Sequence, residues 1–417
     1  MYNLIIYLYQ LGVAIMSHFS GKVNQMWHGE HEALGILQQK VDKSKDYIWF
    51  HAASLGEFEQ GRPLIESIRK NHPELKILLT FFSPSGYEVR KNYEGADIVC
   101  YLPLDTPNNA RKFLQAIKPK AAFFIKYEFW YNYLNLLKQS NIPVYSVSSI
   151  FREGQIFFRW YGKQYGRVLN CITHFYVQND VSKKLLNNIG ITNVTVTGDT
   201  RFDRVLSVMN LSEQLTVIED FLQHHTTPCC VVGSSWENDE DVYLPYFAQH
   251  PELPLIIAPH VVNKDRINKL TRQLQQINRP AICYTDCING TTDTDIVKQA
   301  NTLIIDCYGL LSSIYRYADI TYVGGGFGEG IHNLLEAAVW EKPVIFGPNN
   351  KRFQEACDLK ALGGGFEVCC QQSFTKTISN FVDNKEARQT AGTVALQYIR
   401  DNTGATDKVL AATIDCL

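Results

Sequence analysis

The chain lacks an excess of positive charge, and its cysteines lack the spacing of a zinc site. Its 417 residues include 40 lysines and arginines against 42 aspartates and glutamates, a formal net charge of −2. A dedicated nucleic-acid-binding protein normally shows a basic excess, so nucleic acid is not an expected partner. The eleven cysteines are scattered and form no C-x-x-C. This usage favours reduced thiols in a cytosolic compartment and argues against disulfides and zinc.

Long hydrophobic runs are also scarce, and the one at the N-terminus is short. Tyr2–Met16 carries no charge but contains Asn3 and Gln10, so it is too short and too polar for a confident membrane-spanning helix. It has no basic segment of the kind that begins a signal peptide. The run fits a tyrosine-rich helix that dips into one membrane leaflet, or a core helix that covers a neighbouring domain. We expect residues 1–40 to form a membrane-associating segment.

The usual nucleotide-binding fingerprints are missing, although a glycine-rich loop is present. Five glycines lie between Gly324 and Gly330, but they do not match G-x-G-x-x-G, and no Walker A sequence occurs. Backbone N–H groups in such a loop, beside the start of a helix, can cradle a phosphate. Glu336 follows one turn into the expected helix, near the place of a ribose diol. The loop therefore predicts another type of nucleotide site, with a purely structural loop as the alternative.

A candidate catalytic carboxylate lies near the N-terminus, in His51-Ala-Ala-Ser-Leu-Gly-Glu57. The apolar run 47–50 precedes this segment and the amphipathic run 63–69 follows it, which predicts a strand, a tight turn and a helix. Enzymes of the α/β class present ligand-contacting groups at the carboxyl ends of their strands, where Glu57 would lie. The alternative is that Glu57 only caps the helix, because carboxylates are favoured in first helical turns.

Short apolar runs alternate with helix-compatible segments along the chain, as in parallel sheets that are buried on both faces. The expected strands are residues 47–50, 77–82, 98–102, 121–125, 144–147 and 174–177, then 229–233, 254–258, 281–284, 301–305, 320–323 and 343–346. This pattern predicts an α/β protein of two Rossmann-like, doubly wound domains that face a cleft. We expect the domains to span 41–205 and 206–417, with a polar link over 204–227 and with the last helices able to pack back on the first domain.

A series of collinear motifs resembles the Kdo transferases (3-deoxy-D-manno-octulosonic acid transferases of lipid A biosynthesis). His51-Ala-Ala-Ser-Leu-Gly-Glu57 is similar to the family's H-[ST]-x-S-x-G-E, and Gly330-Ile-His-Asn-Leu-Leu-Glu336 is similar to its G-G-H-N-x-x-E. Further matches lie at residues 80–86, 101–105, 128–130 and 196–203. Each match is weak alone, but their common order along nearly the whole chain is specific.

The resemblance implies an inverting glycosyltransferase of the GT-B fold, with two Rossmann-like domains. It would move Kdo from CMP-Kdo to a lipid A precursor (lipid IVA) in lipopolysaccharide core biosynthesis. Glu57 would be the general base, and Glu128 and Arg201 would stabilise the transition state or the leaving phosphate. The implied CMP-binding residues are Pro259, His260, Tyr308, Gly309, Asn333, Leu334, Leu335 and Glu336. Ser83 and Arg152 are acceptor-side candidates, and neither a metal ion nor a cofactor is implied.

The resemblance implies attachment to the cytoplasmic face of the inner membrane, and the apolar N-terminus fits an acceptor that lies in a bilayer. The expected partners are CMP-Kdo, the lipid A precursor and the membrane surface. Two segments, Asp239-Glu-Asp241 and Asp293-Thr-Asp295, have the D-x-D form of metal-dependent glycosyltransferases. We interpret both as solvated surface.

Several positions depart from the family's pattern. Arg201 stands where the family usually has Lys, and its planar fork differs from a point charge. Pro259-His260 stands in place of the start of P-R-H-P, Lys126 replaces a common acidic residue, and Leu310 replaces a frequent Glu. Leu334 takes a usual proline position, which should affect only the entry into the helix.

Structural roles remain open for single residues. Arg201 could instead bridge Asp199 or Asp203, and Glu128 could form an ion pair with Lys126 or Arg201. His260 could be a loop histidine whose hydrogen bonds are satisfied within the protein. His332 and Asn333 could cap the next helix. For the whole chain, the alternatives are a soluble sugar-nucleotide epimerase of the same architecture and an inactive, membrane-tethered sugar-nucleotide-binding protein.

Overall fold

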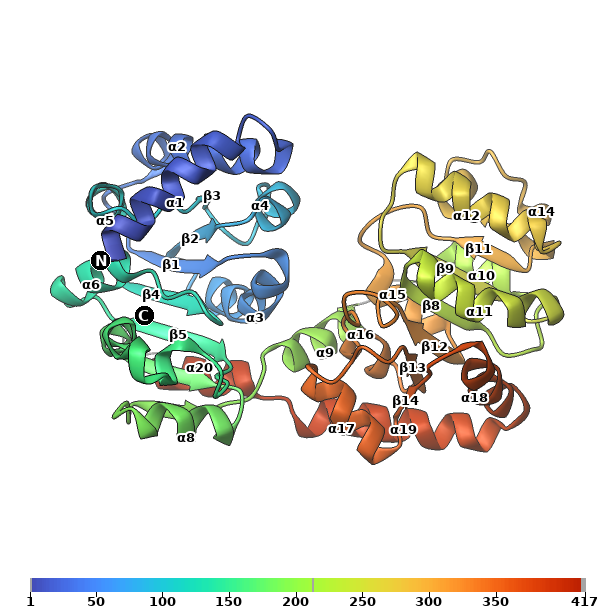
Figure 1. Ribbon diagram of the computed structural model, residues 1–417. Helices are drawn as coiled ribbons and strands as arrows, with labels where there is room; N and C mark the ends of the chain where they lie inside the picture. Colours follow the sequence, from blue (N-terminus) through green and yellow to red (C-terminus); the bar gives the residue numbers. More distant parts are fainter. Residues whose placement is uncertain (1, 212–213, 414–417) are drawn as a thin grey trace. The chain divides into compact units, whose positions relative to one another are not determined.

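The computed structural model describes residues 2–211 and 214–413, which form two compact units (Figure 1). Unit 1 comprises Met1–Arg204 and Asn402–Leu417, and unit 2 comprises Val205–Asp401. The chain therefore returns to the first unit at its end. The return is fixed by Asp203, whose carboxylate accepts hydrogen bonds from Gly404 N (2.6 Å) and Thr406 N (2.7 Å) at the start of helix α20 (Ala405–Thr413).

Unit 1 contains a seven-stranded parallel sheet in the order β3-β2-β1-β4-β5-β6-β7. The strands are β1 (Tyr47–Ala52), β2 (Lys76–Phe81), β3 (Ile98–Tyr101), β4 (Ala121–Ile125), β5 (Val144–Ser149), β6 (His174–Val177) and β7 (Val194–Val196). The strand order reverses between β1 and β4, so the connections that leave these two strands run to opposite faces. Such a switch point at the carboxyl ends of the strands is where α/β sheets bind ligands.

Helices cover both faces of this sheet. One core contains residues of α2 (Gly21–Lys40), α5 (Pro107–Ile117), α6 (Tyr131–Gln139) and α8 (Asp180–Asn188), and the other contains residues of α3 (Leu55–Asn71) and α20. The remaining helices of the unit are α1 (Tyr2–Met16), α4 (Pro84–Arg90), η1 (Ile156–Phe158), η2 (Trp160–Gly162), α7 (Lys163–Gly166) and η3 (Arg167–Cys171). The two cores confirm the doubly wound arrangement expected for this part of the chain.

Unit 2 contains a second seven-stranded parallel sheet, in the order β10-β11-β9-β8-β12-β13-β14. Its strands are β8 (Cys230–Ser235), β9 (Leu255–Pro259), β10 (Ile282–Cys283), β11 (Thr302–Ile304), β12 (Ile320–Val323), β13 (Val344–Phe346) and β14 (Gly365–Glu367). Here the strand order reverses between β8 and β12. The sequence predicts twelve of the strands in the two sheets and misses β7 and β14, which have three residues each.

The helices of unit 2 include α11 (Glu237–Gln249), α12 (Lys264–Gln276) and α18 (Gln371–Asp383), which build the core on one side of its sheet. The other helices are α10 (Thr216–Leu222), α13 (Tyr284–Ile288), α14 (Thr294–Gln299), α15 (Leu311–Ile314), η4 (Tyr315–Tyr317), α16 (Leu335–Ala338), α17 (Gln354–Leu362) and α19 (Lys385–Asp401). The polar segment 204–227 is not a plain linker, because α9 (Arg201–Leu211) and α10 occupy most of it. Ile218 and Phe221 of α10 are fully buried, which explains why this segment folds.

The N-terminal run 2–16 forms one helix, α1, with two different faces. Ile6 and Val13 are buried against unit 1, and the Tyr2 hydroxyl donates a 2.6 Å hydrogen bond to Asp105 Oδ2. The opposite face exposes Leu4, Leu8, Leu11 and Ile15, each with 55–64% of its surface accessible. Among the described residues, no helix is both long enough and apolar enough to cross a membrane.

Candidate active site

Glu57 lies at the switch point of unit 1, in the first turn of α3. It is 9% exposed, and its Oε2 accepts a 2.6 Å hydrogen bond from Ala53 N in the turn after β1. Burial, followed by the negative charge of Glu128, raises the pKa of Glu57 to about 7, while Lys126 opposes this shift. A carboxylate with a pKa near neutrality is suited to take a proton from a hydroxyl. Glu57 therefore caps its own turn, and its raised pKa agrees with the predicted role of a base.

Glu128 follows β4, the strand on the other side of the same switch point. Trp130 Nε1 donates a 2.8 Å hydrogen bond to Glu128 Oε2, and His51 Nε2 lies 3.4 Å from the same oxygen. His51 is fully buried in β1, and its Nδ1 lies 2.9 Å from Thr80 Oγ1. The sequence left an ion pair of Glu128 with Lys126 or Arg201 as an alternative, whereas the polar contacts described for Glu128 are with His51 and Trp130. Glu128 is therefore held next to Glu57 by neighbours that the sequence did not identify.

The acceptor-side candidates Ser83 and Arg152 contact the segments that carry the two carboxylates. Ser83 N donates to Ala53 O (2.7 Å), which joins it to the turn of Glu57, and its side chain caps α4. Arg152 Nη1 donates to the Tyr127 hydroxyl (3.2 Å), next to Glu128 in the sequence. Lys126 adopts a left-handed backbone conformation (φ 66°), and its ammonium lies 5.5 Å from the centre of the Tyr127 ring. The structure thus brings both candidates to the loops that follow β1, β2, β4 and β5.

Arg201 bonds to Asp199, one of the two structural partners expected from the sequence. Its Nε and Nη2 each lie 2.8 Å from Asp199 Oδ2, and its backbone N donates to Oδ1 (2.9 Å). Asp199 is 6% exposed and also accepts from Gln60 Nε2 (3.0 Å). Asp203, the other expected partner, instead holds the start of α20. Asp199 therefore orients both the backbone and the guanidinium of Arg201.

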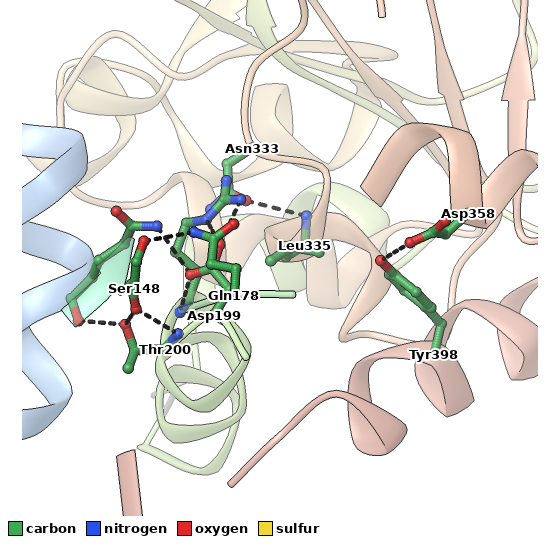
Figure 2. Close-up of polar contacts among 10 residues, drawn as sticks. Ser148, Gln178, Asp199, Thr200, Asn333, Leu335, Asp358 and Tyr398 are labelled. Carbon is green, nitrogen blue, oxygen red and sulfur yellow. Dashed lines mark hydrogen bonds and ion pairs between the residues drawn. The ribbon is translucent and has the colours of Figure 1, made fainter. Parts of the chain in front are cut away.

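The segment that carries Asp199 and Arg201 is anchored to the end of β5 (Figure 2). The hydroxyl oxygens of Ser148 and Thr200 lie 2.8 Å apart, and Gln178 Nε2 donates to Ser148 O (3.0 Å). Ser148 itself has a positive φ of 52°. These contacts fix the start of α9 in unit 1, so Arg201 is placed by the sheet and not by a free loop.

In unit 2, three aromatic rings meet where β8, β9 and β12 end. The rings of Trp236 and His260 stack with their centres 4.6 Å apart, and those of His260 and His332 stack at 4.2 Å. Trp236 Nε1 also donates a 2.9 Å hydrogen bond to His332 Nε2. Burial lowers the pKa of His260, and burial with the neighbouring His260 lowers that of His332 to about 4. His260 follows Pro259, the last residue of β9, and both histidines are neutral at physiological pH.

The predicted segment 333–336 has a capping role. Asn333 Oδ1 accepts from Leu335 N (3.3 Å), as Figure 2 shows, and Asn333 Nδ2 donates to Glu336 Oε1 (2.9 Å). Leu334 and Leu335 are fully buried, so their side chains belong to the core of unit 2. Asn333 thus makes the contact expected of a helix cap, and its amide also orients Glu336.

Tyr308 and Gly309, after β11, form an exposed loop beside the residues that follow β9. Tyr308 is 72% exposed, and its hydroxyl accepts from Val262 N (3.1 Å). Gly309 has a φ of 95°, which favours glycine at this turn. The contact joins the loop after β11 to the loop after His260, so these two predicted CMP segments lie together.

The glycine-rich loop packs closely against the rest of unit 2. A Cβ on Gly324 would lie 2.3 Å from Ser234 O, and one on Gly326 would lie 2.6 Å from Gly347. Several of its N–H groups are used internally: Gly324 N donates to Gly233 O, and both Gly328 N and Gly330 N donate to Gly325 O. The structural role that the sequence left as an alternative thus accounts for these glycines.

Asp239 and Glu240 are fully buried, so the interpretation of 239–241 as solvated surface was wrong for these two residues. Asp239 accepts hydrogen bonds from Gly325 N (2.8 Å), Trp236 N (3.0 Å) and the Tyr322 hydroxyl (2.9 Å). Glu240 pairs with Arg266. The other D-x-D segment, 293–295, is exposed as expected. In the described ranges, no group of three or more His, Cys, Asp or Glu side chains is arranged to hold a metal ion.

Comparison with known proteins agrees with the motifs. Residues 28–204 match the family model of the 3-deoxy-D-manno-octulosonic-acid transferases (kdotransferases). A 3-deoxy-D-manno-octulosonic acid transferase of Haemophilus influenzae is 26% identical over 385 residues, which cover 87% of this chain and 85% of that protein. The resemblance to the Kdo transferases is confirmed. The chain is a glycosyltransferase related to these enzymes.

Two further comparisons define the extent of this relationship. A bifunctional glycosyltransferase/methyltransferase of Fusobacterium nucleatum is 27% identical over 362 residues, and the match spans 83% of this chain but about half (54%) of that relative. The solved structure of UDP-GlcNAc 2-epimerase from Neisseria meningitidis, bound to UDP-GlcNAc, superposes with a TM-score of 0.61 at 15% identity, covering 88% of this chain and all (100%) of that one. The epimerase therefore shares the fold, whereas the sequence relatives are transferases.

Proposed function

We propose that this chain transfers Kdo from CMP-Kdo to a lipid A precursor such as lipid IVA, with inversion and without a metal ion. The observation that carries the proposal is Glu57. This buried carboxylate has a pKa near 7, lies at the switch point of unit 1, and belongs to a motif of the Kdo transferases. Enzymes that activate a hydroxyl need a base with a pKa near the working pH.

In the proposed reaction, Glu57 takes the proton of the acceptor hydroxyl as its oxygen attacks the anomeric carbon of Kdo. The bond between that carbon and the phosphate oxygen breaks, and CMP leaves with the electron pair. Arg201 would stabilise the negative charge that develops on the phosphate. The CMP moiety would lie against Pro259, His260, Tyr308, Gly309 and residues 333–336 of unit 2. Ser83 and Arg152 would line the acceptor side.

We also propose that the enzyme works at the cytoplasmic face of the inner membrane. The supporting feature is α1, whose exposed stripe of Leu4, Leu8, Leu11 and Ile15 lies opposite the buried Ile6 and Val13. An amphipathic helix of this kind can lie in the interface with its apolar face among the lipids. Such attachment would bring unit 1, with Glu57, to an acceptor that resides in a bilayer.

The experiment that tests the function is transfer of labelled Kdo from CMP-Kdo to lipid IVA, measured in the presence of EDTA. Transfer with release of one CMP per Kdo supports the proposal. Release of nucleotide without a lipid product, or no reaction by a folded protein that binds CMP, contradicts it. Incubation with UDP-GlcNAc tests for the epimerase activity suggested by the shared fold, and we expect no epimer to form.

A further inference from the structure

Trp236 and His332 lie edge to edge in unit 2, although 96 positions separate them in the sequence. Their ring planes differ by 9°, their centres are 6.4 Å apart, and Trp236 Nε1 lies 2.9 Å from His332 Nε2. The indole N–H can only donate, so His332 Nε2 must accept. A neutral imidazole that accepts at Nε2 carries its proton on Nδ1. The contact therefore selects one tautomer of His332.

The same contact opposes protonation of His332. An imidazolium would carry a proton on Nε2 that points at the indole N–H, which would place two donors against each other. Burial of the ring and the adjacent His260 act in the same direction, and they lower the pKa of His332 to about 4. His332 thus keeps a single N–H donor across the physiological pH range.

The backbone around the pair is built to hold this geometry. Trp236 N donates to Asp239 Oδ2 (3.0 Å), and Gly325 N donates to the same oxygen (2.8 Å), so one buried carboxylate fixes both the tryptophan and the glycine loop. A Cβ on Gly325 would lie 2.9 Å from His332 Cδ2, so the histidine ring rests directly on that loop. The ring of His260 stacks on both Trp236 and His332. Rotation of His332 would break several contacts at once.

The proton on His332 Nδ1 remains available. Throughout the described ranges, the hydrogen bond from Trp236 is the one found for the His332 ring, and no protein acceptor faces Nδ1. Two predicted donor-binding residues adjoin His332: the His260 ring stacks on it, and Asn333 follows it in the sequence. A fixed donor without a protein acceptor, at the carboxyl ends of parallel strands, is suited to a ligand oxygen.

We propose that His332, held as its Nδ1–H tautomer by Trp236, donates a hydrogen bond to an anionic oxygen of the sugar-nucleotide donor. The inference rests on the proposed function, which supplies that donor. The oxygen belongs to the nucleotide phosphate or to the carboxylate of Kdo, since both present the same acceptor chemistry. His332 is a binding residue in this proposal, and Trp236 is its positioning residue.

Two substitutions of His332 distinguish the roles of its two ring nitrogens. In His332→Gln the amide reaches the former place of Nε2 and keeps an acceptor for Trp236, but the donor at the place of Nδ1 is lost. In His332→Asn the shorter amide keeps an N–H near the place of Nδ1. We expect His332→Gln to weaken binding roughly ten- to hundredfold, the usual range for a hydrogen bond to a charged group, and His332→Asn to stay within about threefold of wild type.

Binding is measured by calorimetry with cytidine, CMP and CMP-Kdo. A loss in His332→Gln with CMP but not with cytidine identifies the phosphate, and a loss with CMP-Kdo alone identifies the Kdo carboxylate. Equal affinities of wild type and His332→Gln for both CMP and CMP-Kdo would overturn the inference while leaving the proposed function intact. A folded wild type that binds neither ligand would remove the donor assignment itself.

The tautomer is tested without any ligand by nitrogen-15 NMR of the histidine side chains, with His332→Asn used for assignment. We expect a protonated Nδ1, an unprotonated Nε2 and no titration of His332 between pH 5.5 and 8, as follows from a pKa of about 4. Trp236→Phe keeps the ring but removes the donor, so the fixed tautomer should be lost. Trp340→Phe, which removes an indole N–H bonded to Ser312 O, is the matched control and should change nothing. A protonated Nε2 in wild type would refute the assignment.

Discussion

Glu57 Oε2 accepts a 2.6 Å hydrogen bond from Ala53 N, so the turn that carries the carboxylate also orients it. The turn is fastened in its place, because Ala53 O accepts from Ser83 N (2.7 Å) after the neighbouring strand β2. The candidate base is therefore positioned by backbone groups of two adjacent strand ends. Replacing the carboxylate with an amide should leave this geometry intact and change only the chemistry.

We expect Glu57→Gln to lower the rate of Kdo transfer by about 10²- to 10⁴-fold, the usual contribution of a general base. The glutamine oxygen can still accept from Ala53 N, but the amide cannot take a proton. The affinity for CMP should not change, because the proposed CMP site lies in unit 2. Transfer of labelled Kdo and CMP calorimetry give the two measurements.

Glu66→Gln is the matched control for this substitution, since it lies in the same helix α3 and its carboxylate is 36% exposed. It should retain the wild-type rate. A Glu57→Gln enzyme that works within about tenfold of wild type would exclude Glu57 as the base.

The pH dependence of transfer should report the ionisation of Glu57. Because its pKa is raised to about 7, the rate should fall below pH 7 as the base becomes protonated. Glu128→Gln removes the negative charge that is the second cause of the raised pKa, so the acid limb of the pH–rate profile should move to lower pH. Rates of both enzymes measured from pH 5 to pH 9 locate the acid limb of each profile.

Trp130→Phe controls for the loss of structure around Glu128. It removes the indole donor to Glu128 Oε2 but keeps the negative charge, so the acid limb should move little. If Glu128→Gln and Trp130→Phe shift the limb equally, the effect comes from the position of Glu128 and not from its charge.

The parallel sheets were predictable because their strands are short apolar runs between helix-compatible segments. Runs such as 121–125 and 320–323 are buried throughout, and the structure places a strand at each. The sequence did not predict β7 and β14, since Val194–Val196 and Gly365–Glu367 each contain an exposed polar residue and are too short to show a period. It also did not identify α10 in the polar link, where a few buried residues are enough to fold a polar segment.

The site was predictable only where a motif lies within one turn. Ala53 and Glu57 are only four residues apart, so the sequence pattern predicted the turn, the start of the helix and the carboxylate together. The contact of Trp236 with His332 spans 96 positions, and nothing in either segment identifies the other. Asp239 looked like surface because a D-x-D pattern does not show that Gly325 N and the Tyr322 hydroxyl will meet it.

Arg201 should act mainly through its charge. Its Nε and Nη2 both bond to a single oxygen of Asp199, so one side of the fork is structural. We expect Arg201→Lys to keep transfer within about tenfold of wild type, and Arg201→Met to lower it roughly 10²- to 10³-fold by removing the cation near the leaving phosphate. Initial rates of Kdo transfer at saturating CMP-Kdo measure the difference.

The neighbouring Arg204→Met is the control, because Arg204 pairs with Glu59 and Glu66 and has no proposed part in the reaction. Its rate should match wild type. An Arg201→Met enzyme with nearly full activity would mean that the charge of Arg201 has no part in the reaction.

Attachment to membranes should depend on the exposed face of α1. The double substitution Leu8→Glu with Leu11→Glu places charge where 61% and 59% of the side-chain surface is accessible, so the fold should survive. We expect the fraction bound to anionic phospholipid vesicles to fall more than about tenfold, because two apolar anchors are lost and two negative charges are added. Vesicle flotation measures binding, and CMP affinity serves as the check on folding.

Val89→Glu is the matched substitution, since Val89 on α4 is 57% exposed but lies outside the stripe on α1. It should leave flotation unchanged. Equal flotation of the wild type and the α1 double variant would contradict attachment through this helix.

Glu30 on α2 should make the stability of unit 1 depend on pH. It is 6% exposed, its Oε1 has no hydrogen-bond partner among the described residues, and burial raises its pKa to about 8. A carboxyl with a raised folded-state pKa contributes stability that is fully present below its unfolded pKa, about 4.5, and is lost as the pH rises through about 8. Glu30→Gln stays neutral and has no such dependence. The free energy of unfolding of wild type relative to Glu30→Gln should therefore fall by up to about 1.4 kcal/mol per pH unit between pH 5 and 8, and then level off.

Urea unfolding of both proteins at several pH values measures this difference. The control is Glu32→Gln, an exposed neighbour on α2, whose free energy of unfolding should change with pH in parallel with that of wild type. A constant gap between wild type and Glu30→Gln over this range would show that Glu30 is ionised in the folded protein at neutral pH.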